Sequence, residues 1–189
     1  MPLKDKEAFF AQLSNLYKMM DNAWDEAASH YGFKCRGCGE NCCETNFYHH
    51  TLIEKQYLLK GFAGLDRDLV KKIRDSAARV CEKRAEARLS QENIRIMCPL
   101  NKDGWCLLYA YRPMICRLHG IPHELCRPGS SVVRMPGCSA GEPLFKARPY
   151  FKFDRTVFYS RMAELEMAFR QFTGKREKIK QTVAEMLLG

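Results

Sequence analysis

The stretch that decides the fold reads CPLNKDGWCLLYAYRPMICR, from Cys98 to Arg117. It holds three of the ten cysteines of the chain. Residues 101–104 have the composition of a tight turn, and we predict that this turn returns Cys106 toward Cys98 in a knuckle-like arrangement. Pro99 removes a backbone donor and favours an extended approach of Cys98. The pattern is therefore typical of thiols brought together by a turn.

The wider segment 93–150 is rich in cysteine, proline and glycine and shows no sustained apolar periodicity. A structureless segment of this length is uncommon inside a compact domain. We therefore predict that a metal bound by thiols organises the segment and keeps it ordered.

Amphipathic helices are predicted on both sides of this segment, where apolar residues recur at three- and four-residue steps. Thr51 with Glu54 has the form of a capping box, and Gly61 would end the helix that it opens. Asp66 and Asp154 are candidate N-caps. The predicted helices run over 4–30, 51–60, 66–89 and 154–172, with a last helix that ends at Leu188.

The fold class that follows is mainly α, with helices packed around an irregular cysteine-rich metal-binding knot and little or no sheet. The length of 189 residues favours a single domain. Its parts are an N-terminal helix over 1–34, a cysteine-cluster core with inserted helices over 35–148, and C-terminal helices over 149–189.

The first cysteine cluster reads CRGCGENCC, from Cys35 to Cys43. Two cysteines separated by two residues can bind one ion through a tight turn, and glycines there let backbone amides approach sulfur. Adjacent Cys42 and Cys43 point in different directions, so one of them can serve a second ion or pack inward.

Eight cysteines are candidate metal ligands: Cys35, Cys38, Cys42, Cys43, Cys98, Cys106, Cys116 and Cys138. We expect a first site on Cys35, Cys38, Cys98 and one of the adjacent pair, and a second on Cys106, Cys116, Cys138 and the other. Cys81 lies on the apolar side of a predicted helix and is expected in the core.

Three further residues leave two interpretations open. Cys126 is either a ligand or a structural thiol. His119 and His123 have the spacing of some zinc ligands, yet Pro122 argues against one regular helix face, and hydrogen-bonded loop histidines are the simpler interpretation. For His49 and His50, roles in capping or at the surface are favoured over ligation.

The arrangement from Cys35 to Cys43, then Cys98-Pro99, then the spacing from Gly104 to Arg117, resembles the YkgJ-like cysteine-cluster (CxxCxxCC) proteins. That family is described as zinc- or iron-chelating, and the resemblance covers about residues 35–120. The family usually has two residues before the adjacent pair, where this chain has three. The resemblance implies metal binding, often of an iron–sulfur cluster. Flagellin lysine methylases carry a similar cluster, so it does not specify an activity.

The preponderance of thiols among the candidate ligands and the Cys-Pro ligand favour an iron–sulfur cluster, [4Fe–4S], over zinc. Either centre takes four thiolates, and the sequence spacing serves both.

The net charge of +9 is concentrated around the later cysteines, since residues 95–148 contain eight basic and three acidic residues. A four-thiolate site keeps a charge of about −2 after metal binding. We expect four arginines to offset it, namely Arg112, Arg117, Arg127 and Arg134. No motif of a known RNA-binding module is visible, so nucleic acid is not the favoured partner.

The longest run without Asp, Glu, Lys or Arg is Ala8–Tyr17, which is too short for a membrane span. No apolar signal core follows the first ten residues, so we expect a cytoplasmic protein. Clustered cysteines in a reducing compartment more often serve metal or redox chemistry than disulfides.

Three functions remain open from the sequence. The first is a metal-cluster protein for redox chemistry, electron transfer or metal handling, with a redox or acidic protein partner. The second is a structural-zinc module that binds nucleic acid or an acidic protein. The third is a cluster-containing transferase or oxidoreductase, although no familiar nucleotide-binding or hydrolase motif occurs.

Overall fold

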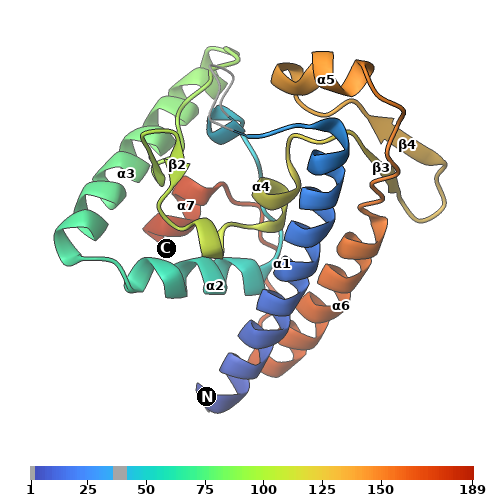
Figure 1. Ribbon diagram of the computed structural model, residues 1–189. Helices are drawn as coiled ribbons and strands as arrows, with labels where there is room; N and C mark the ends of the chain where they lie inside the picture. Colours follow the sequence, from blue (N-terminus) through green and yellow to red (C-terminus); the bar gives the residue numbers. More distant parts are fainter. Residues whose placement is uncertain (1–2, 36–41) are drawn as a thin grey trace. The chain divides into compact units, whose positions relative to one another are not determined.

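The computed structural model describes residues 3–35 and 42–189 (Figure 1). The fold is mainly helical, as predicted, and the strands of the described residues form two small two-stranded sheets. The longer helices are α1 (Leu3–Tyr31), α2 (Leu52–Ala63), α3 (Arg67–Leu89) and α6 (Thr156–Thr173), and the shorter ones are α4 (Met114–Leu118), α5 (Glu142–Lys146) and α7 (Val183–Leu188). Single 3₁₀ turns lie at η1 (Cys42–Glu44), η2 (Tyr109–Tyr111) and η3 (Ser139–Gly141). No helix in this part of the chain combines the length and apolar character that a bilayer span requires.

The chain divides into two compact units, each of which combines separate parts of the sequence. Unit 1 comprises residues 1–40 and 114–176, and unit 2 comprises residues 41–113 and 177–189. The single domain expected over 1–189 stays a prediction.

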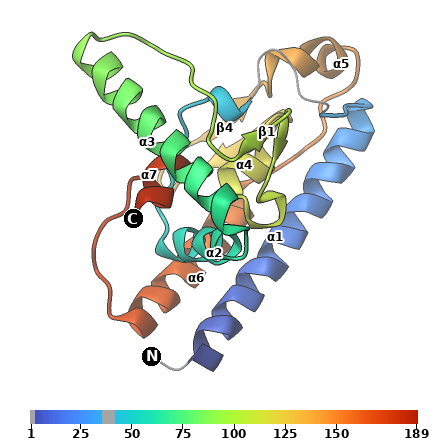
Figure 2. The same cartoon turned by 90° about the vertical axis from the view of Figure 1, so that its left-hand side faces the viewer.

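In unit 1, α1 and α6 pack along each other (Figures 1 and 2). The apolar stripe predicted on α1 is buried there, with Leu13 and Met20 fully inaccessible to solvent. Phe9 of α1 meets Phe169 of α6 with ring centroids 5.4 Å apart. Helical periodicity in the sequence therefore identified both the helices and the faces that they bury.

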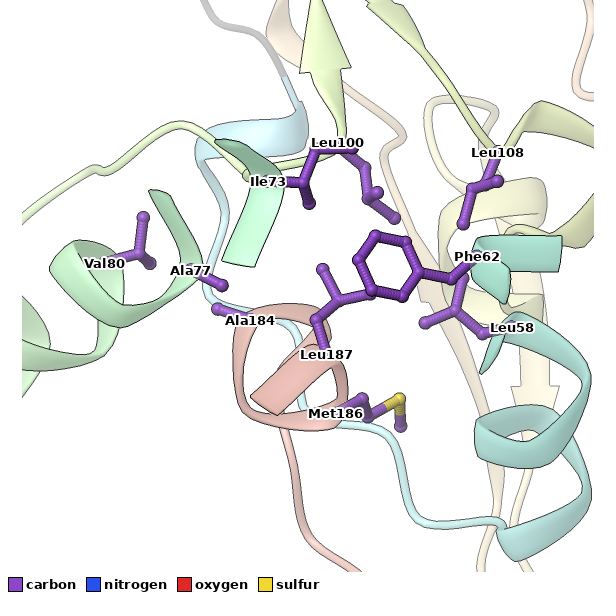
Figure 3. Packing of buried hydrophobic residues seen from close by; sticks show 10 residues of the cluster. All are labelled: Leu58, Phe62, Ile73, Ala77, Val80, Leu100, Leu108, Ala184, Met186 and Leu187. Atoms are coloured by element: carbon purple, nitrogen blue, oxygen red, sulfur yellow. The ribbon is translucent and has the colours of Figure 1, made fainter. Parts of the chain in front are cut away.

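In unit 2, α3 packs against α7, and α2 also contacts α7. The shared core, shown in Figure 3, combines residues from these helices and from the loops around the cysteines: Leu58, Phe62, Ile73, Ala77, Val80, Leu100, Leu108, Ala184, Met186 and Leu187. Cys81 packs against this core, as expected. Burial of each large side chain contributes ~1.5–3 kcal/mol, so apolar packing helps to hold the cysteine-bearing loops in place.

Residues 93–150 contain more regular structure than predicted, although long stretches of the segment are irregular. This segment contains two antiparallel hairpins, β1 (Asn101–Lys102) with β2 (Trp105–Cys106) and β3 (His123–Cys126) with β4 (Val132–Met135). Hydrogen-bonded hairpins and buried apolar residues contribute to the order of this segment, and the expectation that a metal organises it stays a prediction.

The helix ends differ from prediction in three places. Thr51 precedes α2 but donates its hydroxyl to Glu54 and does not cap a backbone N–H. Gly61 lies inside α2, since the helix continues to Ala63. Asp154 accepts from the Thr156 N–H, although Arg155 is the residue directly before α6. Propensity located the helices more reliably than it identified their caps.

The cap predicted at Asp66 is confirmed, because its carboxylate accepts from the backbone N–H groups of Asp68 and Leu69. A complete capping box occurs where we did not predict one, at the start of α7. There the Thr182 hydroxyl accepts from the Glu185 N–H at 3.3 Å, and the Glu185 carboxylate accepts from the Thr182 N–H at 2.6 Å.

Candidate metal centre

The β1–β2 hairpin confirms the predicted return of the chain between Cys98 and Cys106. Asn101 pairs with Cys106, and the two turn residues, Asp103 and Gly104, have φ angles of 52° and 88°. Positive φ at both positions is typical of the two-residue turns that match strand twist. The Asn101 carboxamide also accepts from the Gly104 N–H at 3.1 Å. Local turn chemistry therefore places one cysteine before the hairpin and another in its second strand.

Cys43 joins the same part of unit 2 from a distant place in the sequence. The Cys98 N–H donates to the Cys43 carbonyl oxygen at 2.9 Å. This bond sets the end of η1 beside the start of the hairpin. We call Cys43, Cys98 and Cys106 the cysteine trio.

The Cys98 thiol of the cysteine trio is strongly perturbed by its surroundings. Burial raises its pKa to about 12, and a hydrogen bond from the backbone of Leu100 opposes this rise. The neighbouring Cys43 and Cys106 thiols raise the pKa, whereas the Arg84 cation lowers it. Cys98 is consequently a neutral thiol at pH 7 without a bound cation, which argues against a reactive redox dithiol at this place.

Arg84 of α3 is a residue that sequence reasoning missed. It lies three residues after Cys81, on the same side of the helix, and this spacing was the available signal. Two of the four arginines expected to offset the charge of a metal site form ion pairs with carboxylates. Arg117 pairs with Asp21 at 2.6 Å, and Arg134 pairs with Glu124 at 2.9 Å. Those two arginines therefore neutralise carboxylates of unit 1.

The remaining two arginines also differ from expectation. The Arg112 guanidinium lies 3.8 Å from the centre of the Tyr109 ring, and Arg127 is exposed. Two aromatic residues of this region are largely exposed, Trp105 at 61 % and Tyr109 at 50 %. The hairpin tip and the turn after it consequently face solvent.

A complete ligand set is not present among the side chains that the structure describes. No three His, Cys, Asp or Glu side chains within this set are arranged to hold a metal ion. Cys38 and the side chain of Cys42 lie outside it, and Cys35 is exposed. The predicted knot therefore stays a prediction.

The later cysteines belong to unit 1 and occupy separate local structures. Cys116 lies in α4, and the Cys138 N–H donates to the Gly120 carbonyl at 2.9 Å. Cys126 ends β3, and its thiol lies 3.3 Å from the Ser130 carbonyl oxygen. The two-site partition placed Cys98 and Cys106 in different sites, whereas the hairpin brings them into one neighbourhood.

His123 follows the structural interpretation, whereas the capping or surface role expected for His49 is wrong, because its side chain is buried. His123 Nδ1 lies 3.0 Å from the Ile121 carbonyl oxygen, which is the hydrogen-bonded arrangement expected. His49 is 2 % exposed and exchanges backbone hydrogen bonds with Gln181. His50 is exposed.

Comparison with known proteins adds no assignment: no family model, no curated protein and no solved structure matches the chain.

Proposed function

We propose that the chain is a metal-binding protein that holds an iron–sulfur cluster, with zinc as the alternative, through thiolates that include Cys43, Cys98 and Cys106. The observation that carries this proposal is the central position of Cys98. Its N–H is bonded to the Cys43 carbonyl, and the β1–β2 hairpin turns Cys106 back to its side. Two chain segments distant in sequence thus supply thiols to one neighbourhood.

The chemistry of this neighbourhood suits a soft metal. The donors are sulfur atoms, and the backbone hydrogen bond from Leu100 to Cys98 is of the kind that stabilises a thiolate ligand. Burial opposes ionisation of Cys98, so a cation that replaces the thiol proton removes the main electrostatic obstacle. Arg84 supplies an additional positive charge.

A fourth thiolate comes, in this proposal, from the segment just before Cys43. Cys42 directly precedes it in the sequence. The thiols of Cys116 and Cys138 are candidates for a second site, which belongs to the same proposal but depends on fewer observations.

The surroundings of Tyr48 in unit 2 support an acidic protein as the partner. Arg88 lies 5.8 Å from the centre of the Tyr48 ring, and Lys180 lies 5.0 Å from it. Both cations are exposed, and Arg84 donates to Asn46 nearby. A positive surface of this kind accelerates association with an acidic redox protein.

The metal proposal is tested by purifying the protein without oxygen and measuring iron, acid-labile sulfide and zinc. We expect ~4 iron and ~4 sulfide per chain, with visible absorption that bleaches on reduction. About one or two zinc ions per chain in place of iron would establish the alternative. A folded, colourless chain with neither metal contradicts the proposal.

The partner proposal is tested with poly-glutamate as the acidic probe. Binding should weaken steeply as salt increases. The double variant R88E/K180E should lose it, whereas K72E/R79E, which reverses two exposed cations of α3 and changes the net charge equally, should weaken it less. Equal losses in both variants would point to net charge alone.

A further inference from the structure

Arg155 of unit 1 is a buried cation whose partners are incomplete. Its exposed fraction is 7 %, and its Nε and Nη2 atoms are buried with no hydrogen-bond partner. The side chain lies against the Phe153 ring, 5.5 Å from the ring centre. A ring face stabilises a cation but accepts no strong hydrogen bond from a guanidinium. Two strong donors therefore point to no acceptor of the protein.

The carboxylates near Arg155 form hydrogen bonds with other groups. Glu124 accepts from Arg134 at 2.9 Å and is also hydrogen-bonded to Tyr150. Asp154 accepts from the Thr156 N–H at 2.8 Å. Burial lowers the pKa of Arg155 to about 10, so the side chain is still a cation at neutral pH. The positive charge consequently lacks an anionic partner, which is uncommon for a buried arginine.

The position of Arg155 in the fold adds positive potential. It directly precedes α6, an 18-residue helix, and its side chain does not cap that helix. A helix N-terminus attracts anions through its dipole. At α6 the Asp154 carboxylate already accepts from the Thr156 N–H, so the helix contributes a positive field and not free donors.

Two histidines share this neighbourhood. Burial lowers the pKa of both His119 and His123, and the positive charge of Arg155 lowers them further. His123 already uses Nδ1 for the Ile121 carbonyl, so in the tautomer with hydrogen on Nδ1 its Nε2 faces other groups as an acceptor. On protonation each ring becomes a donor to an anion.

We propose that Arg155, with His119 and His123, forms a binding site for a small oxyanion beside the start of α6. The guanidinium donates a pair of parallel hydrogen bonds from Nε and Nη2 to two oxygens of the ligand, the geometry that carboxylates and phosphates share. The bound charge neutralises Arg155 and complements the start of α6. The anion is a carboxylate or a phosphoryl group of a small molecule.

The site is tested by isothermal titration of the full-length protein with inorganic phosphate and, separately, with acetate at matched ionic strength. We expect one saturable event with a dissociation constant on the order of 1 mM or tighter for at least one probe. Phosphate alone identifies the phosphoryl class, and acetate alone identifies the carboxylate class. No saturable binding of either probe up to about 50 mM overturns the proposal.

Variants separate the site from general surface charge. R155M should weaken binding at least tenfold, R155K should weaken it less because lysine cannot form the paired bonds, and R176M, at an exposed arginine, should leave it unchanged. Binding that survives in R155M overturns the proposal.

Thermal unfolding shows whether R155M still folds, so that lost binding is not confused with a lost fold. R155M replaces an unpartnered buried cation with an apolar side chain, so it should unfold at or above the temperature of the wild type without anion. The ligand should raise the melting temperature of the wild type and not that of R155M. Metal content provides an independent readout, since loss of anion binding with metal retained leaves the metal proposal untouched.

Discussion

The two hairpins of this protein both carry a cysteine, yet they use it differently. In the β1–β2 hairpin, Cys106 faces a neighbourhood that also holds Cys98 and Cys43. In the β3–β4 hairpin, the Cys126 thiol turns back on its own loop and lies 3.3 Å from the Ser130 carbonyl. A cysteine in a hairpin is therefore not by itself a ligand candidate.

The turns explain this contrast. The first hairpin closes through Asp103 and Gly104 alone, and the backbone that enters it bonds to Cys43. The second closes through residues 127–131, a longer loop whose carbonyl oxygens lie within reach of the thiol. In the first hairpin, the short turn and the backbone bond to Cys43 bring several thiols close together. In the second hairpin, the thiol contacts carbonyl oxygens of its own longer loop.

The most direct way to break the comparison is to remove one thiol from each hairpin. C98S should lose at least ~90 % of the bound metal, because it removes the thiol between Cys43 and Cys106. C126S should retain the metal, because its thiol is satisfied by its own loop. Metal analysis of the two variants after anaerobic purification measures the difference. Equal metal content in C98S and C126S would show that the two hairpins do not differ in their role in metal binding.

Acid provides a second comparison, between His49 of unit 2 and His123 of the second hairpin. Burial is the main cause that lowers the pKa of each to about 4, helped by His50 for His49 and by Arg155 for His123. The unfolded chain binds a proton near pH 6.5 and the folded chain does not until about pH 4, so stability falls as pH falls through this window.

Protonation of the two histidines should lower the stability of the fold by different amounts. Between neutral pH and about pH 4, the free energy of unfolding should fall by about 3 kcal/mol because of His49, which is 2 % exposed. The fall should be smaller for His123, because solvent screens a partly exposed ring. Urea unfolding between about pH 7 and pH 4 should show a flatter pH dependence in H49Q than in H123Q. An unchanged slope in H49Q would contradict the burial argument.

The support beneath the first hairpin is tested at Gly61. A methyl group there would overlap the ring of Tyr111, which belongs to η2 just after the hairpin. G61A should therefore cost ~1–3 kcal/mol through overpacking, even though alanine favours helix by ~1 kcal/mol.

Gly64 is the matched control at the end of the same helix. A Cβ there would lie 3.4 Å from the Gly61 carbonyl oxygen, which is close to ordinary contact. G64A should change the free energy of unfolding by less than ~0.5 kcal/mol. Equal effects at the two glycines would show that Tyr111 yields to the added methyl group.

The smallest effects compare the two turns themselves. Gly104 and Gly129 have φ angles of 88° and 74°, and neither has any atom within 4 Å of an added Cβ. G104A and G129A should each cost ~1–2 kcal/mol through backbone strain alone. Competition with a chelator should show weaker metal binding only in G104A, since only that turn orients candidate ligands. Weaker binding in both variants would show a general effect of stability.

The sequence predicted the helices and the first hairpin well and the second hairpin not at all. Helical periodicity and the turn composition of Asn101–Gly104 are local signals, and local signals were sufficient there. The loop of the β3–β4 hairpin does contain a turn signal, Pro128-Gly129, but the flanking strands gave no strand pattern that would identify a hairpin. Its strand β4 is exposed throughout and shows no alternation of burial.

The candidate site was predictable as residue types and not as an arrangement. The cysteines and the resemblance they carry are legible in the chain, and so are the apolar faces of α1, α3 and α6, because these depend on neighbours a few residues apart. Three-dimensional packing alone revealed that Cys98 bonds to Cys43, that Arg84 stands beside the trio and that Arg155 is buried without a carboxylate. These relations join residues distant in sequence, and they depend on how buried surfaces and charges are shared once the chain is folded.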